Sequence, residues 1–160
     1  MAIVGRARTA TGAGVIATLI LVLVFGNQAF TEWVSRHTAG DTVWGWFLRV
    51  LTWPAWTLTS TASVRDLLAQ DLRAVLLVVF VALVLAFAGR SVSGTGGLLL
   101  GWAALIFGSA LAAFVTAFLA THSSWLGAFE AAGDGSRYGL YAGWLVGIAV
   151  AGFKGRVAAA

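Results

Sequence analysis

Four long stretches without a charged residue constrain this sequence most strongly; they cover 9–31, 74–89, 91–121 and 138–153. The hydrocarbon core of a bilayer is about 30 Å thick, so a helix needs about 20 apolar residues to cross it. The first and third stretches meet that length. The other two can cross if Arg73 and Lys154 extend their charged ends to the membrane surface. Only 10% of the residues are charged, compared with about 25% in soluble domains.

We therefore predict an all-α integral membrane protein that forms one domain over residues 1–160. It is a bundle of four transmembrane helices, at about 10–30, 71–89, 97–121 and 137–153. Small residues near Ala29 would suit a signal-peptide cleavage site, but the apolar run before them is longer than usual, so we expect an uncleaved anchor. Ser63 and Asp66 have the spacing of a helix-capping pair, which predicts that the second helix begins there, outside the membrane.

The charged residues divide into two groups along the chain. Five basic residues and no acidic residue lie at alternate helix ends: Arg6, Arg8, Arg90, Lys154 and Arg156. All six acidic residues lie in the other connections. Because basic residues concentrate on the cytoplasmic side, both termini are expected to be cytoplasmic. The same pattern explains the pI near 10.7 without nucleic acid as a partner. The excess of arginine over lysine, with abundant Ala, Gly and Val, points to a bacterial plasma membrane.

Residues 42–58 form the least usual segment, and they lie within a region that holds five of the eight tryptophans. A fifth membrane span there would carry Arg49 in its middle, and Pro54 lacks the N–H that a continuous helix needs. A crossing would also reverse every later helix and place the basic tail outside. We therefore favour a helix that lies in the outer membrane surface, or re-enters it shallowly, with its tryptophans at headgroup level.

Small residues recur every fourth position in the last two predicted helices. One ridge runs along Gly139, Gly143, Gly147 and Ala151, and a matching set in the preceding helix includes Gly101, Gly108 and Ala112. Small residues at this spacing allow two helices in a membrane to approach closely. The two ridges could pack against each other within one chain, or could form an interface with a second copy or another subunit.

The tryptophans of the 42–58 segment also allow two interpretations. They could anchor the chain at the interface, or they could wall an aromatic pocket formed by Trp44, Trp46, Trp53 and Trp56. In that pocket Arg49 or Arg36 would hold a lipid headgroup, quinone or pigment. His37 and His122 are predicted on the same side, where they could take part in an external metal or acid–base site, but no ligand spacing supports this over solvated loop residues.

No motif predicts catalysis or a particular cofactor. The chain contains no cysteine, which excludes disulfides and cysteine-ligated metals. No charged residue or histidine lies in the central part of a predicted span, which argues against a proton-coupled transporter. The leading hypothesis is therefore an accessory or scaffold subunit of a larger membrane complex, in contact with lipids and with other subunits or a second copy. The alternatives are a protein that binds or transports a lipophilic molecule, and an outer-face enzyme that modifies lipids.

Overall fold

All regular secondary structure in the part of the chain that the computed structural model describes is helical. The described residues are 10–56, 64–88, 94–119 and 124–157. In chain order the helices are α2 (Ala10–Phe25), α3 (Gln28–His37), α4 (Val43–Leu51), α5 (Val64–Ala88), α6 (Thr95–Ala117) and α7 (Trp125–Val157). The prediction of an all-helical protein is confirmed for these residues.

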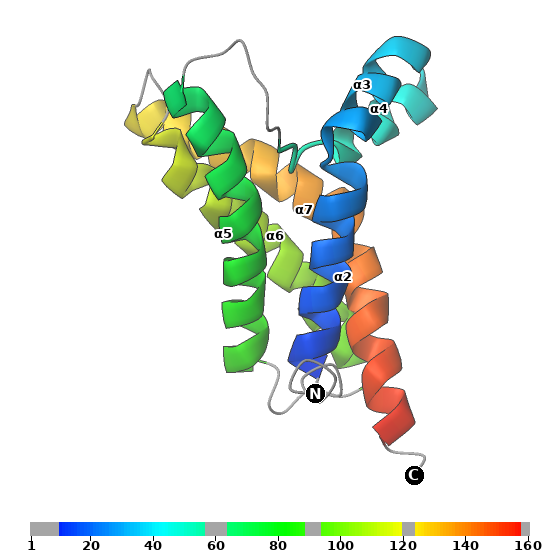
Figure 1. Cartoon of the computed structure of the whole chain (residues 1–160). Coiled ribbons are helices and arrows are strands. Elements are labelled where there is room, and N and C mark those ends of the chain that lie inside the picture. Colours follow the sequence, from blue (N-terminus) through cyan, green and yellow to red (C-terminus); the bar gives the residue numbers. More distant parts are fainter. Residues whose placement is uncertain (1–9, 57–63, 89–93, 120–123, 158–160) are drawn as a thin grey trace.

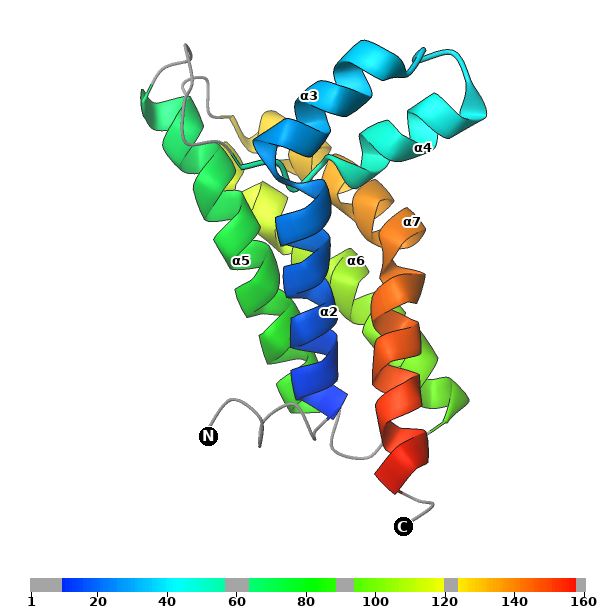
Figure 2. The same cartoon turned by 45° about the vertical axis from the view of Figure 1, so that its right-hand side comes forward.

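The long helices α2, α5, α6 and α7 form a bundle, and the short helices α3 and α4 extend beyond one end of it (Figures 1 and 2). The start of α2, the end of α5, the start of α6 and the end of α7 lie at one end of the bundle. The starts of α5 and α7 lie at the opposite end, on the side where α3 and α4 extend. The long helices therefore alternate in direction along the chain.

Among the described residues, two helical segments are long and apolar enough to cross a membrane, namely Leu67–Ala88 within α5 and Thr95–Ala117, which is α6. A third is possible if α2 and α3 count as one bent span. The nine-residue α4 would rise only about 14 Å, less than half of the hydrocarbon core. The length of α4 therefore does not allow it to cross a bilayer by itself.

The first predicted helix, 10–30, is not continuous, because the chain bends by 56° between α2 and α3. Asn27 stabilises both sides of the bend. Its side-chain oxygen accepts a hydrogen bond from the Phe30 N–H at 2.8 Å, and its amide nitrogen donates to the carbonyls of Leu23 and Val24 at 3.1 and 2.7 Å. An asparagine is a preferred residue at the start of a helix, and here it also satisfies the end of the preceding one.

Trp56 closes the same bend from a distant part of the sequence. Its backbone N–H donates to the Gly26 carbonyl at 2.9 Å, and its indole N–H donates to the Val22 carbonyl at 3.2 Å. A Cβ atom on Gly26 would lie 2.5 Å from the Pro54 carbonyl oxygen, so the two segments require glycine at this position. The Gly26 carbonyl, at the bend, thus has a hydrogen-bond donor from outside the helix, whereas the Val22 carbonyl accepts the Trp56 indole in addition to the Gly26 N–H.

The helix α7 begins well before the predicted start at residue 137. Residues 133–135, whose two glycines would also suit a turn, lie within the 33-residue α7. A Cβ atom on Gly135 would overlap the Ser109 carbonyl of α6. Gly135 is therefore a site of close helix contact, whereas Gly133 has open space around its Cα atom.

The packing of α6 uses two different faces. Gly101 meets the backbone of Gly147 in α7, where a Cβ atom on Gly101 would lie 2.7 Å from the Gly147 Cα atom. Gly108, in contrast, faces α5, and its Cβ atom would lie 2.7 Å from the Val81 Cγ2 atom. The small residues of α6 therefore do not form one ridge against α7, because part of this set accommodates α5.

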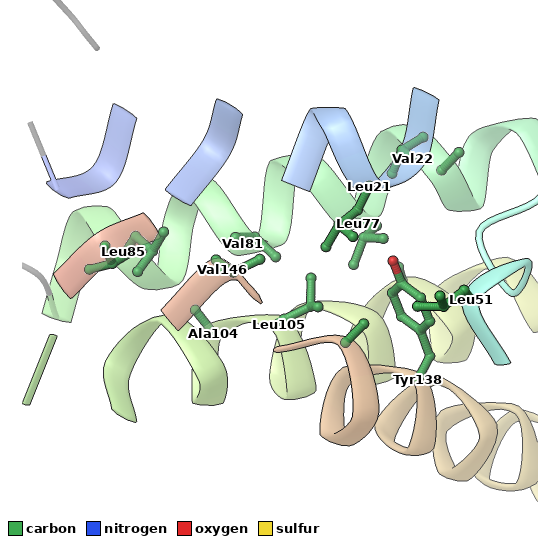
Figure 3. Close-up of a cluster of buried hydrophobic side chains, with 14 of the residues drawn as sticks. Leu21, Val22, Leu51, Leu77, Val81, Leu85, Ala104, Leu105, Tyr138 and Val146 are labelled. Carbon is green, nitrogen blue, oxygen red and sulfur yellow. The ribbon is translucent and has the colours of Figure 1, made fainter. Parts of the chain in front are cut away.

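The buried side chains of α2, α5, α6 and α7 meet in one apolar cluster (Figure 3). α5 contributes one stripe to it, Leu77, Val81 and Leu85, while Leu83 on the opposite side is exposed. One face of α5 is therefore buried in the bundle, and the opposite face is exposed. Tyr138 of α7 lies at the end of the cluster nearest α4, and its hydroxyl points inward on the side of Leu77 (Figure 3).

Candidate functional site

The segment after α4 places the aromatic ring of Trp53 in the lining of two adjoining hollows. Thr42 caps the start of α4, because its hydroxyl accepts a hydrogen bond from the Gly45 N–H at 3.0 Å, and the helix ends at Leu51. Pro54 cannot donate a helical hydrogen bond, so the chain turns after Thr52. The turn directs Trp53 toward α5 and α7, where its ring stacks on Tyr138 with 5.1 Å between the centroids.

Two hollows adjoin at Trp53 and Asp134, and together we name them the arginine–aromatic cleft. The α5 lobe has a volume of about 400 Å³ and lies between α5, the end of α6 and the start of α7. The α4 lobe has a volume of about 540 Å³ and lies between α4 and α7. The α4 lobe is lined by Trp46, Arg49, Val50, Trp53, Asp134, Arg137, Tyr138 and Tyr141. Each lobe is within the usual volume range of a small-molecule site.

Arg73, Trp53 and Tyr138 form a layered contact across three segments of the chain. The guanidinium carbon of Arg73 lies 4.8 Å from the centroid of the Trp53 ring, and this ring also stacks on Tyr138. A cation over an indole face is attracted by about 0.5–2 kcal/mol, depending on exposure to water. The Nε atom of Arg73 and the hydroxyl of Tyr138 are both buried without a hydrogen-bond partner.

The charged lining of the cleft is predominantly positive. Arg73, Arg49 and Arg137 face one acidic residue, Asp134. Asp134 is paired with Arg137 at 3.4 Å, and both side chains are well exposed. Arg49 donates one hydrogen bond to the Thr38 carbonyl at 3.2 Å. The pairing of Asp134 with Arg137 therefore leaves Arg49 and Arg73 without a carboxylate partner among the described lining residues.

The structure brings together three of the six residues predicted to form an aromatic pocket. Trp46 and Trp53 line the cleft with Arg49, and the Trp46 ring packs edge-on against Tyr141 at 4.8 Å between centroids. The other three lie elsewhere.

Trp44 is exposed and stacks on Phe47, while Arg36 pairs with Glu32 at 3.1 Å on the surface of α3. Trp56 lies in a separate apolar groove between α2 and α5. Its hydrogen bonds to the α2–α3 bend hold it there, away from the cleft.

Sequence reasoning missed the residues that α5 and α7 contribute to the cleft. Arg73 was expected to extend into water, but its guanidinium lies over Trp53 instead. Asp134 was assigned to a loop, and Arg137, Tyr138 and Tyr141 were not considered. Asp134, Tyr138 and Tyr141 are spaced four and three positions apart, so they share one face of a helix. This face could not be predicted while the helix was expected to begin at residue 137, because Asp134 then lay outside it.

The predicted packing residues lie inside the molecule. Gly139, Gly143 and Gly147 of α7 face Ile106, Trp102 and Leu98 of α6, respectively. Trp102 also donates its indole N–H to the Leu140 carbonyl at 2.9 Å. Ala151 lies against Gly97, and Ala112 is buried. The close contacts of these α7 glycines are thus intramolecular.

The predicted external histidine site is not assembled by the described residues. His37 stacks on Trp33, with 5.3 Å between the ring centroids, and its Nδ1 atom lies 3.0 Å from the Trp33 carbonyl oxygen. His122 lies outside the described residues. Within the described ranges, no group of three or more potential metal ligands comes together.

The arginine–aromatic cleft thus defines a helical protein with apolar, membrane-length segments and a cationic aromatic hollow at one end of its bundle. No known protein family, curated protein or solved structure matches this chain.

Proposed function

We propose that α2, α5, α6 and α7 are four membrane spans of a bacterial plasma-membrane protein with cytoplasmic termini. Several features support this proposal. The long helices alternate in direction (Figure 1). The acidic residues lie in segments near the α3–α4 end. α3 and α4 would then lie at the outer membrane surface, where tryptophan is favoured.

Within this arrangement, the chain binds a lipophilic molecule in the arginine–aromatic cleft. The observation that supports this function best is the wall of Trp46, Trp53 and Tyr141, contributed by two segments, around an open hollow of about 540 Å³. Aromatic walls with a few polar groups are typical of sites for lipids, quinones and pigments. The ring of Trp53 serves both lobes, so it is the residue on which binding depends most.

The test is to purify the protein in a mild detergent, extract bound lipophilic molecules and identify them by mass spectrometry. A defined molecule should be retained by the wild-type protein and lost from Trp53→Ala. Trp144→Ala is the matched control, because Trp144 is an exposed tryptophan of α7 that does not line the cleft. Equal retention by both variants would contradict the proposed site.

An accessory subunit of a larger membrane complex is the second candidate function. The exposed apolar surface of the α3–α4 pair supports it, since Trp33, Val43 and Trp44 have exposed fractions of 49%, 85% and 66%. The predicted glycine ridges do not add support, because their close contacts lie within the chain. The test is co-purification in a mild detergent. A partner subunit should co-purify at fixed stoichiometry with the wild-type protein and with Trp144→Ala, but not with Trp44→Ala. If the partner co-purifies with both variants, the α3–α4 surface is not its binding site.

A further inference from the structure

Arg73 is a charged residue within an apolar segment that is long enough to cross a membrane. It belongs to the Leu67–Ala88 segment of α5. An ionisable residue at such a position is costly and normally has a partner that offsets its charge. Among the described residues, the recorded partner of Arg73 is the ring of Trp53, and its Nε atom is buried with no hydrogen bond.

Two acidic residues of the described part of the chain lie near Arg73, on α7 and on α5 itself, and no ion pair joins either of them to it. Asp134 lines the same lobe but is paired with Arg137 at 3.4 Å. Asp71 is two positions away on α5 and so points to another face of the helix. It lines the grooves on the α2 side and beside Leu119, not the arginine–aromatic cleft.

The contact with Trp53 does not satisfy the hydrogen-bonding capacity of the guanidinium, because the Nε atom of Arg73 is still buried without a partner. A buried donor of this kind favours a bound acceptor in addition to the ring contact. A phosphate or carboxylate group would add charge-assisted hydrogen bonds to the guanidinium, which is the side chain best suited to bind such anions.

We propose that Arg73 binds the anionic group of an amphiphilic molecule whose apolar part extends along the arginine–aromatic cleft. The α5 lobe is also lined by Gln70 and Ser124, whose side chains can donate hydrogen bonds to an anion. Arg49 adds a second positive charge in the adjoining lobe. This inference rests on the proposed binding function and names the class of its ligand: an anionic amphiphile, such as a phospholipid with a net negative headgroup.

The experiment measures lipid selectivity. Purified, delipidated protein in a non-ionic detergent is mixed with equal amounts of phosphatidylglycerol and phosphatidylcholine that carry the same acyl chains. Native mass spectrometry then counts each lipid bound. We expect the wild-type protein to prefer phosphatidylglycerol by about tenfold or more, as the loss of one charge-assisted hydrogen-bonding partner would imply.

Arg73→Gln should abolish the preference, while Arg65→Gln should keep it. Arg65 is a matched control, because it is on the same helix but lines a different groove. Arg73→Lys retains the charge without the planar guanidinium and should show an intermediate preference. If Arg73→Gln does not fold, the selectivity of the wild-type protein and of Arg73→Lys still decides the question.

The outcomes separate a failure of the anionic-ligand assignment from a failure of the proposed binding function. Equal binding of the two lipids by the wild-type protein overturns the anionic assignment but leaves the proposed function standing. Absence of both lipids, together with recovery of a neutral lipophilic molecule in the extract, has the same meaning. If inorganic phosphate alone stabilises the protein against heat as strongly as phosphatidylglycerol does, the ligand is a free anion and the amphiphile is excluded.

Discussion

At the scale of single residues, the glycines of α7 differ in what a methyl group would meet. A Cβ atom on Gly139 would overlap the backbone of Ile106, whereas Gly133 has nothing within 4 Å. We therefore expect Gly139→Ala to destabilise the protein by about 1–3 kcal/mol, because the two helices must separate. Gly133→Ala should be neutral, or stabilising by up to about 1 kcal/mol, since alanine favours a helix more than glycine does.

Thermal unfolding of both variants in the same detergent measures this difference. The comparison is matched, because both substitutions add one methyl group to the same helix. Similar midpoints for the two variants would show that α6 and α7 do not meet at Gly139. Leu83→Phe provides a further reference, because Leu83 lies on the exposed side of α5 and should tolerate a larger apolar side chain.

At the scale of elements, the bend between α2 and α3 depends on one side chain that serves two helix ends. Asn27→Ala removes the hydrogen bond from the Phe30 N–H and the two bonds to the Leu23 and Val24 carbonyls. The lost cap alone should cost about 0.5–2 kcal/mol. Ser35→Ala is the control, because Ser35 is an exposed residue of α3 that bonds only to a carbonyl of its own helix.

The expected result is a lower unfolding midpoint for Asn27→Ala than for Ser35→Ala, measured by circular dichroism. A midpoint for Asn27→Ala at or above that of the wild-type protein would mean that α2 and α3 prefer to form one straight helix. The bend also places Trp56, so a loss of the bend should change tryptophan fluorescence in the same variant.

At the scale of the whole molecule, the charge distribution predicts the orientation of the bundle. Single cysteines can be introduced freely, because the chain has none. Gly40→Cys and Gly133→Cys should react with a membrane-impermeant maleimide in intact cells. Ala159→Cys, in the basic tail outside the described residues, should react only after the cells are permeabilised. Labelling of residue 159 but not of residue 133 in intact cells would reverse the proposed orientation.

The sequence determined the helical class and the approximate location of the long helices. Backbone polar groups must be satisfied within each segment in lipid, so long uncharged runs can hardly form anything but helices. The sequence also indicated that the helix containing Arg49 is short, because Pro54 ends the possible hydrogen-bonding pattern. Trp46, Arg49 and Trp53 were recognised as candidates because aromatic walls with a cationic contact suit a lipophilic ligand with a polar group.

Only the tertiary structure decided which face each residue presents and what it meets there. The glycines at 133–135 suit a turn or a close helix contact equally well, and the contact with Ser109 decides between them. Gly108 fits a ridge toward α7 by spacing, yet Val81 of α5 occupies the adjacent space. Arg73 is twenty positions from Trp53 in the sequence, and their contact depends on how α4, α5 and α7 pack. Helical periodicity fixes relations within a helix, whereas a site between helices depends on packing that no single segment specifies.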